Sequence, residues 1–119
     1  MKPERAVDYV GHIIEAIDRI ASYTSGLDQE AYLRGTLVQD AVIRNFEIIG
    51  EAASNVERQA PDVAAAHPEI PWSFMRGMRN RLAHGYFNVD HVRIWVTLRD
   101  DLPPLRDQLE ALRRELKNG

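Results

Sequence analysis

Residues 38–56, V-Q-D-A-V-I-R-N-F-E-I-I-G-E-A-A-S-N-V, decide the fold class of this 119-residue chain. Steps of three and four residues, the spacing that puts side chains on one face of an α-helix, relate Val38, Val42, Asn45, Ile49, Ala52 and Val56. A second set of residues widens the apolar coverage of the same helix: Leu37, Ala41, Phe46, Ile48 and Ala53. The pattern therefore predicts a central helix, the most buried of the fold.

A similar pattern precedes this stretch. We expect a first helix from about Glu4 to Thr24, because apolar residues recur there at helical spacing: Val7, Val10, Ile14, Ile17 and Ala21. Gly26 is well placed to take the left-handed conformation that ends many helices. The polar residues 28–34 then lead into the central helix.

After the central helix, three prolines make a long regular element improbable: Pro61, Pro68 and Pro71. We expect a connector there, in which residues 63–67 form a short helical turn. A third helix should begin near Pro71 or Trp72, because the first helical turn has unused N–H groups and tolerates proline. It should stop near Gly85.

The last element carries an apolar seam with alternating steps of three and four: Trp95, Leu98, Leu102, Leu105, Leu109, Leu112 and Leu116. Pro103 and Pro104 must bend or restart this helix, because proline lacks an N–H and its ring clashes with the preceding turn. Asp100 and Asp101 are better explained as caps of a restarted helix than as a catalytic pair of carboxylates.

These patterns predict an all-α fold. The sequence shows neither sustained strand alternation nor internal repeats, and its length suits one domain over residues 1–119. We expect an up-and-down bundle of four main helices with a kinked C-terminal helix. The long apolar helices also leave room for a homodimer interface.

Composition narrows the classes of function. The chain has no cysteine, which excludes disulfides and thiolate-bound metal and suits a reducing cytoplasm. No signal peptide or membrane helix is visible. The net charge of −3 argues against bulk coating of nucleic acid. Residues 71–86, however, contain three arginines and no acid. The rest of the chain, with 12 basic and 18 acidic residues, has a net charge of −6.

One short run in this basic segment gathers groups that can carry chemistry. Residues 79–86 read R-N-R-L-A-H-G-Y. Arginine can grip a phosphate with two hydrogen bonds, histidine can move protons near neutral pH, and tyrosine adds a reactive hydroxyl. The candidate residues of this run are Arg79, Asn80, Arg81, His84 and Tyr86.

Helical geometry places several of these candidates together. Arg76, Asn80 and His84 are four residues apart and share a polar face, with Arg79 beside Arg76. At the last turn, exposed carbonyls favour a protonated His84 and the neighbouring arginines disfavour it, so the sign of its pKa shift stays open. A plainer alternative also stays open, in which the arginines are solvated charges and the histidine a cap.

Other polar residues give weaker signals. Along the central helix, four charged residues recur at steps of three and four: Asp40, Arg44, Glu47 and Glu51. This spacing predicts ion pairs within the helix. Alternatively, Arg44 or Glu47 borders a dimer cleft. The remaining histidines lack the spacing of a helical metal site: His12, His67 and His91. We therefore expect no metal site.

Three strings carry a family resemblance: M-R-N-R-L-A-H-G-Y-F, the preceding I-P-W, and Q-D-A-V-I-R-N-F-E-I-I-G-E-A-A. They resemble the HepT-like ribonuclease toxins of the HEPN superfamily, and the likeness spans nearly the whole chain. That family has an arginine, four intervening residues, a histidine, one residue and a tyrosine. Arg79, His84 and Tyr86 match these positions.

The resemblance implies a function. HepT-like proteins are homodimers whose two motifs face a common cleft, and they cut RNA without metal; no cofactor is implied. Each is encoded with a small nucleotidyltransferase antitoxin, which silences it by attaching AMP to the motif tyrosine. By this resemblance the chain is a cytoplasmic toxin that cleaves RNA, with tRNA as the expected target, and Tyr86 is the modified residue.

The residue types suit this chemistry, because RNA supplies its own nucleophile in the 2′-OH. His84 would move the proton and Arg79 would neutralise developing charge. Asn80 would orient the phosphate or the histidine, and Arg76 or Arg81 would draw the strand in. The rival interpretation is a helical dimer that binds a nucleotidyltransferase or a nucleotide without cutting RNA, and a plainer one is a purely structural bundle.

Overall fold

The structure, a computed structural model, describes residues 4–83 and 89–118, with side chains for 6–78 and 89–118. Its helices are α1 (Glu4–Thr24), α2 (Gln29–Arg34), α3 (Thr36–Gln59), α4 (Pro61–Ala66), α5 (Trp72–Ala83), α6 (His91–Val96) and α7 (Leu102–Asn118). A π-helical turn, η2 (Thr97–Asp101), joins α6 to α7. The described residues contain no strand, so the predicted all-α class is confirmed.

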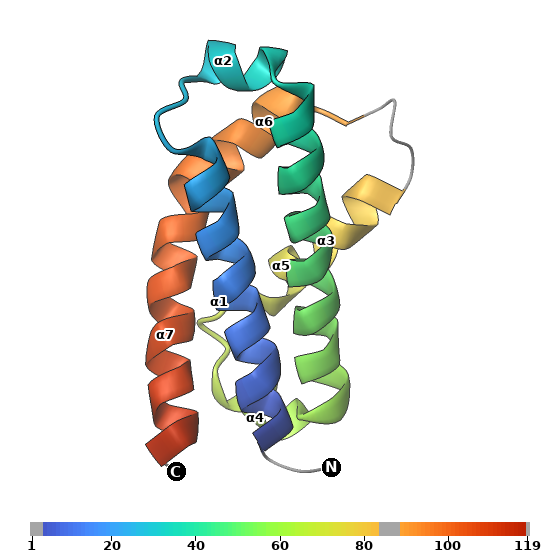
Figure 1. Ribbon diagram of the computed structural model, residues 1–119. Coiled ribbons are helices and arrows are strands. Elements are labelled where there is room, and N and C mark those ends of the chain that lie inside the picture. Colours follow the sequence, from blue (N-terminus) through green and yellow to red (C-terminus); the bar gives the residue numbers. More distant parts are fainter. Residues whose placement is uncertain (1–3, 84–88, 119) are drawn as a thin grey trace.

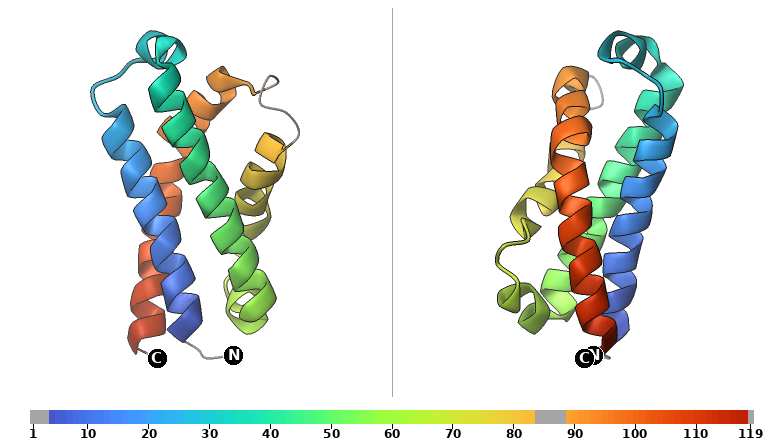
Figure 2. Two further views of the ribbon diagram at one scale, coloured as in Figure 1. Left: turned by 45° about the vertical axis from the view of Figure 1, so that its right-hand side comes forward. Right: turned by 90° about the vertical axis from the view of Figure 1, so that its left-hand side faces the viewer.

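The long helices run alternately up and down, as Figure 1 shows. α3 packs against α1 and α5, and α1 packs in turn against α7. α1 begins and α7 ends at the same end of the bundle. α5 passes behind α3 in Figure 1, and its C-terminal end lies on the side of α3 away from α1 in Figure 1 and in the left view of Figure 2. α3 is thus the central helix, as predicted.

Most of the predicted seam of α3 is buried. Val42, Ile49 and Val56 are fully enclosed, and Asn45 is buried with its amide donating to the Ala41 carbonyl at 2.9 Å. The prediction for Leu37 was wrong, because it lies in the first turn of α3 and is 83% exposed. A helix end projects past its neighbours, so helical periodicity alone overestimates burial there.

The polar residues 28–34 form a helix that the apolar pattern did not reveal. Asp28 caps α2 by accepting a hydrogen bond from the Ala31 N–H at 2.8 Å, and Tyr32 is fully buried. Gln39 is buried as well, and its amide donates to the Tyr32 and Leu33 carbonyls at the end of α2. Because these contacts connect separate helices, spacing within one segment could not predict them.

Two other expectations about chain breaks hold. Gly26 has φ +78°, the left-handed conformation expected at the end of α1. The connector contains only α4, which starts at Pro61 rather than at residue 63. α5 then begins at Trp72, whose indole N–H donates to the His67 carbonyl at 3.1 Å.

The C-terminal helix does not restart at its prolines. Between α6 and α7 the backbone stays in the right-handed helical region, and the Leu102 N–H donates to the Thr97 carbonyl five residues earlier. This widened turn accommodates Pro103 and Pro104, which cannot donate to the helix. Asp100 and Asp101 therefore lie within η2 and do not cap α7, so that prediction was wrong. The seam from Trp95 to Leu112 is buried as expected.

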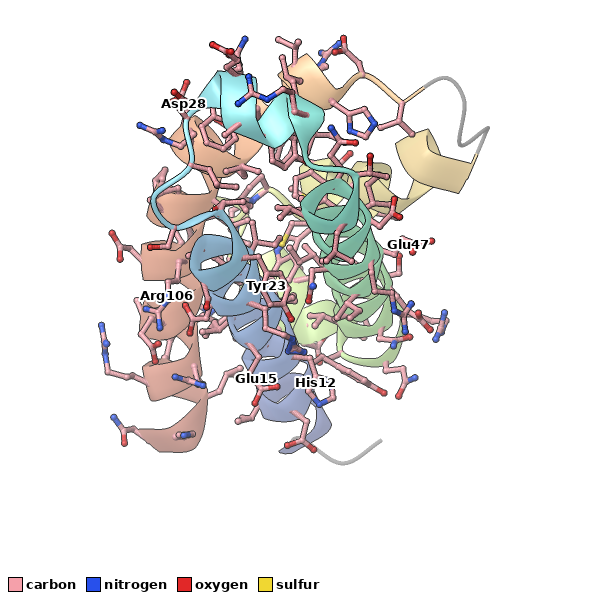
Figure 3. All side chains as sticks on the ribbon, turned by 45° about the horizontal axis from the view of Figure 1, so that its top comes forward. His12, Glu15, Tyr23, Asp28, Glu47 and Arg106 are labelled. Carbon is pink, nitrogen blue, oxygen red and sulfur yellow. The ribbon has the colours of Figure 1, made fainter. Side chains whose placement is uncertain are left out.

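An ion pair fastens α7 to α1. Arg106 donates to both carboxylate oxygens of Asp18, at 2.6 and 3.1 Å, and Figure 3 shows Arg106 on α7. The hydrogen bond from Arg106 lowers the pKa of Asp18 below its ordinary value of 3.8. Both side chains are partly exposed, so solvent screens much of the attraction.

Replacing Asp18 by asparagine should lower the free energy of unfolding at neutral pH. The contribution of an acid with a lowered pKa is present above its ordinary pKa and is lost as pH falls through the lowered value. Urea unfolding at pH 7 and near pH 2 should show a difference from the native protein only at the higher pH. A difference of equal size at both would contradict the role of the charge.

Candidate functional site

The candidate site is built on α5. Trp72, Met75 and Met78 are buried against the core, whereas the side chain of Arg76 is 43% exposed. Within residues 72–78, whose side chains the structure describes, Arg76 therefore lies on the polar face predicted for it from spacing. α5 packs on α3, and its C-terminal end lies on the far side of α3 from α1 (Figure 2).

The structure describes the motif only in part. Positions 79–81 belong to the last turns of α5, so Asn80 follows Arg76 by one turn of this helix. The side chains of Arg79, Asn80 and Arg81 lie outside the described residues, as do His84 and Tyr86 altogether. The roles assigned to these five residues stay predictions.

Arg76 has a partner that the sequence did not reveal. Its guanidinium forms a hydrogen-bonded ion pair with Glu57 of α3. The two residues are 19 positions apart, so no local spacing links them. The pair anchors the polar face of α5 to α3 and offsets part of the positive charge of residues 71–86. Arg76 is therefore less available to an RNA phosphate than a free arginine would be.

The charged residues along α3 do not form the ion pairs that we predicted around Arg44. Arg44 is exposed and has no carboxylate within 4.0 Å among the described residues, although Glu47 and Glu51 are close in sequence. Glu47 points away from the bundle in Figure 3. A place for Arg44 or Glu47 at the edge of a dimer cleft stays a prediction.

The other histidines lie apart from one another. His12 is exposed with its ring edge-on to Tyr9, and His67 lies between Glu69 and Glu115. His91, the first residue of α6, contacts Tyr32 edge-on, and its buried Nδ1 has no hydrogen-bond partner within residues 4–83 and 89–118. Within the described part of the chain, no three histidines or acids are grouped so that they could hold a metal ion.

Burial has one clear electrostatic effect near α6. Tyr32 is fully enclosed, and desolvation raises the pKa of its phenol to about 12. Its hydroxyl therefore stays neutral at physiological pH. Tyr32 packs against Trp95 and His91 as part of the core, so it is not a candidate for the modified tyrosine.

Comparison with known proteins places the chain in a family. Residues 13–112 match the family described as Ribonuclease HepT-like. A protein from Thermococcus cleftensis named "Probable ribonuclease HepT" is 43% identical over 90% of this chain and 94% of its own length. A protein from Methanocaldococcus jannaschii named "Putative RNase" is 30% identical over 97% of each chain. No solved structure matches the chain significantly.

The fold and the matched sequence together define an all-α protein of ribonuclease type. The chain belongs to the HepT-like ribonuclease family, and the predicted family is confirmed. The match covers every long helix at least in part and includes the whole of residues 79–86.

None of the described helices is long and apolar enough to cross a membrane.

The pair between Arg76 and Glu57 should contribute little to stability. Both side chains are partly exposed, at 43% and 31%, and pairs of this kind are worth about 0–1 kcal/mol. A double-mutant cycle with Arg76→Gln and Glu57→Gln, followed by urea unfolding, measures the coupling directly. A coupling of several kcal/mol would mean that the pair is far more desolvated than its exposure indicates.

Proposed function

We propose that this chain is a metal-independent RNA endonuclease and the toxin of a toxin–antitoxin system, with tRNA as its expected substrate. The observation that carries the proposal is the family match over residues 13–112, which contains the arginine, histidine and tyrosine in the family spacing. Residues 71–86 contain three arginines and no acid, and this local positive charge supports an anionic substrate.

The proposed reaction needs proton transfer and charge stabilisation from the protein. The ribose 2′-OH attacks the adjacent phosphorus, the bond to the 5′ oxygen breaks, and a 2′,3′-cyclic phosphate and a 5′-OH result. His84 moves a proton to or from these oxygens, and Arg79 stabilises the charge that develops on the phosphoryl oxygens. Asn80 orients the phosphate or the imidazole, while Arg76 or Arg81 attracts the strand.

The proposal includes a homodimer in which two motifs face one cleft. The outer position of the C-terminal end of α5 supports this, because a second subunit can approach it without displacing α1 or α7 (Figure 2). Two basic segments in one cleft would concentrate positive charge in a protein that is acidic overall. An RNA strand would then be attracted to the cleft more strongly than to the rest of the surface.

A nucleotidyltransferase partner would control this activity through Tyr86. Transfer of AMP to the phenol adds a negatively charged phosphodiester and a bulky nucleoside two residues from His84. The added phosphate competes with substrate phosphate for the arginines and the nucleoside blocks the cleft. The modification would therefore inhibit the enzyme without unfolding it.

Cleavage should depend on the motif and not on metal. In a chelator, purified protein should cut tRNA, whereas His84→Ala and Arg79→Ala should lose at least about a hundredfold in rate, a typical loss for one proton-transfer or charge-stabilising group. Gel analysis of the products measures the rate, and Arg114→Ala, on the exposed side of α7, serves as the matched control.

Equal cleavage by the native protein and both motif variants would disprove the catalytic assignment. Intact RNA at every concentration of native, unmodified protein, together with tight binding of a nucleotidyltransferase or a nucleotide, would favour the non-catalytic binding dimer instead. A purely structural bundle would show neither behaviour.

Co-expression with the partner nucleotidyltransferase should add whole AMP units to the protein. Intact mass spectrometry should detect them on the native chain. It should also detect them on Tyr32→Phe, because the phenol of native Tyr32 is buried and is not a target. The added mass should vanish in Tyr86→Phe. Persistence of the modification in Tyr86→Phe would place it on another residue.

A further inference from the structure

A groove of about 400 Å³ lies beside the π-helical turn, at the end of α5 opposite to the motif. Two elements form it, the start of α5 and the region where η2 passes into α7. Its lining residues are Pro71, Phe74, Asp101, Pro104, Leu105 and Gln108. Its volume lies within the range of about 300–1,000 Å³ that is common for binding sites.

Contacts of the segment between α4 and α5 hold the walls of this groove in place. The Gln108 amide donates to the Glu69 carbonyl at 3.1 Å, and the Trp72 indole donates to the His67 carbonyl at the same distance. The His67 ring also lies 3.0 Å from a carboxylate oxygen of Glu115 on α7. The segment before α5 is thus tied to α7, which fixes the two walls of the groove relative to each other.

The polar side chains of the groove offer two acceptors, the Asp101 carboxylate and the Gln108 amide oxygen. Asp101 is exposed and has no hydrogen-bond or ion-pair partner among the described residues. Gln108 uses one of its two amide N–H groups on the Glu69 carbonyl, and its own amide oxygen is the second acceptor. The remaining lining residues are apolar. A complementary ligand therefore combines an apolar body with hydrogen-bond donors.

The charge around the groove favours a cation. Asp100 adds a second exposed carboxylate next to Asp101. The nearest arginines in sequence are engaged elsewhere, because Arg99 lies over the Trp95 ring at 5.3 Å and Arg106 binds Asp18. A phosphate-bearing strand would be repelled here, whereas an arginine or lysine would gain a charge-assisted hydrogen bond.

We propose that this groove docks a basic, partly apolar peptide segment of a partner protein. An apolar side chain of the segment packs between Phe74 and Leu105, and a neighbouring arginine or lysine donates to Asp101. The site is separate from residues 79–86, since Phe74 lies in the first turn of α5 and the motif begins at its last turns. The inference does not rest on the proposed ribonuclease activity.

The test uses the full chain, labelled with ¹⁵N, and the probe peptide acetyl-Leu-Arg-Leu-amide. A matched peptide carries citrulline, which keeps the shape of arginine and removes its charge. The arginine peptide should shift the amide signals of Phe74, Leu105 and Gln108, with a Kd on the order of 1 mM for so small a probe. The citrulline peptide should bind about tenfold more weakly.

Two variants locate the binding site. Asp101→Asn should weaken binding of the arginine peptide about tenfold, whereas Asp107→Asn, the same change at an exposed position of α7 outside the groove, should leave it within about twofold. Fold integrity is read from the remaining amide signals of each variant.

Three results would overturn the proposal. The first is the absence of groove shifts at saturating peptide, or equal shifts with the citrulline peptide. The second is a set of groove shifts produced by the oligonucleotide tetrauridylate, which would assign the groove to RNA. The third is a set of groove shifts that follows protein concentration without peptide, which would assign it to a second copy of the chain.

Discussion

The burial of α3 on two sides is the constraint on which the rest of the structure depends. Its apolar face packs on α1, its flank packs on α5, and Val42, Ile49 and Val56 are completely enclosed. Burying each such side chain contributes about 1.5–3 kcal/mol. Because Met75 and Met78 of α5 are buried in the same core, the packing also determines which face of α5 stays outside. The position of the candidate site is therefore a consequence of the core.

Helical periodicity predicted much of this arrangement. The limits of α1, the register of α5 and the leucine seam of α7 follow from spacing within one segment, which is the information that a sequence displays directly. Three features were missed: the helix α2, the π-helical turn η2, and the pairing of Arg76 with Glu57. Each depends on a contact between segments or on a local widening of the helix, which periodicity does not encode. For the site, the polar face of α5 was predictable, while the roles of Arg79, His84 and Tyr86 rest on the family pattern.

The two ends of α5 differ in chemistry. The C-terminal end carries the arginines at positions 79 and 81 in a stretch without acids, and the N-terminal end forms one wall of a groove that contains Asp101. One helix of 12 residues thus separates a segment suited to an anionic strand from a groove suited to a cationic peptide. A partner held at the groove would lie at the other end of α5 from the proposed catalytic segment and would not compete for its arginines.

In the proposed reaction, α5 and the residues after it cleave RNA through the substrate's own 2′-OH. The most direct measurement compares an RNA oligonucleotide with one in which a single 2′-deoxyribose stands on the 5′ side of the main cleavage position. Cleavage at that position should disappear while binding of the oligonucleotide is unchanged, because the nucleophile is lost and the phosphates remain. Continued cleavage at the 2′-deoxy position would contradict the mechanism and require water as the nucleophile.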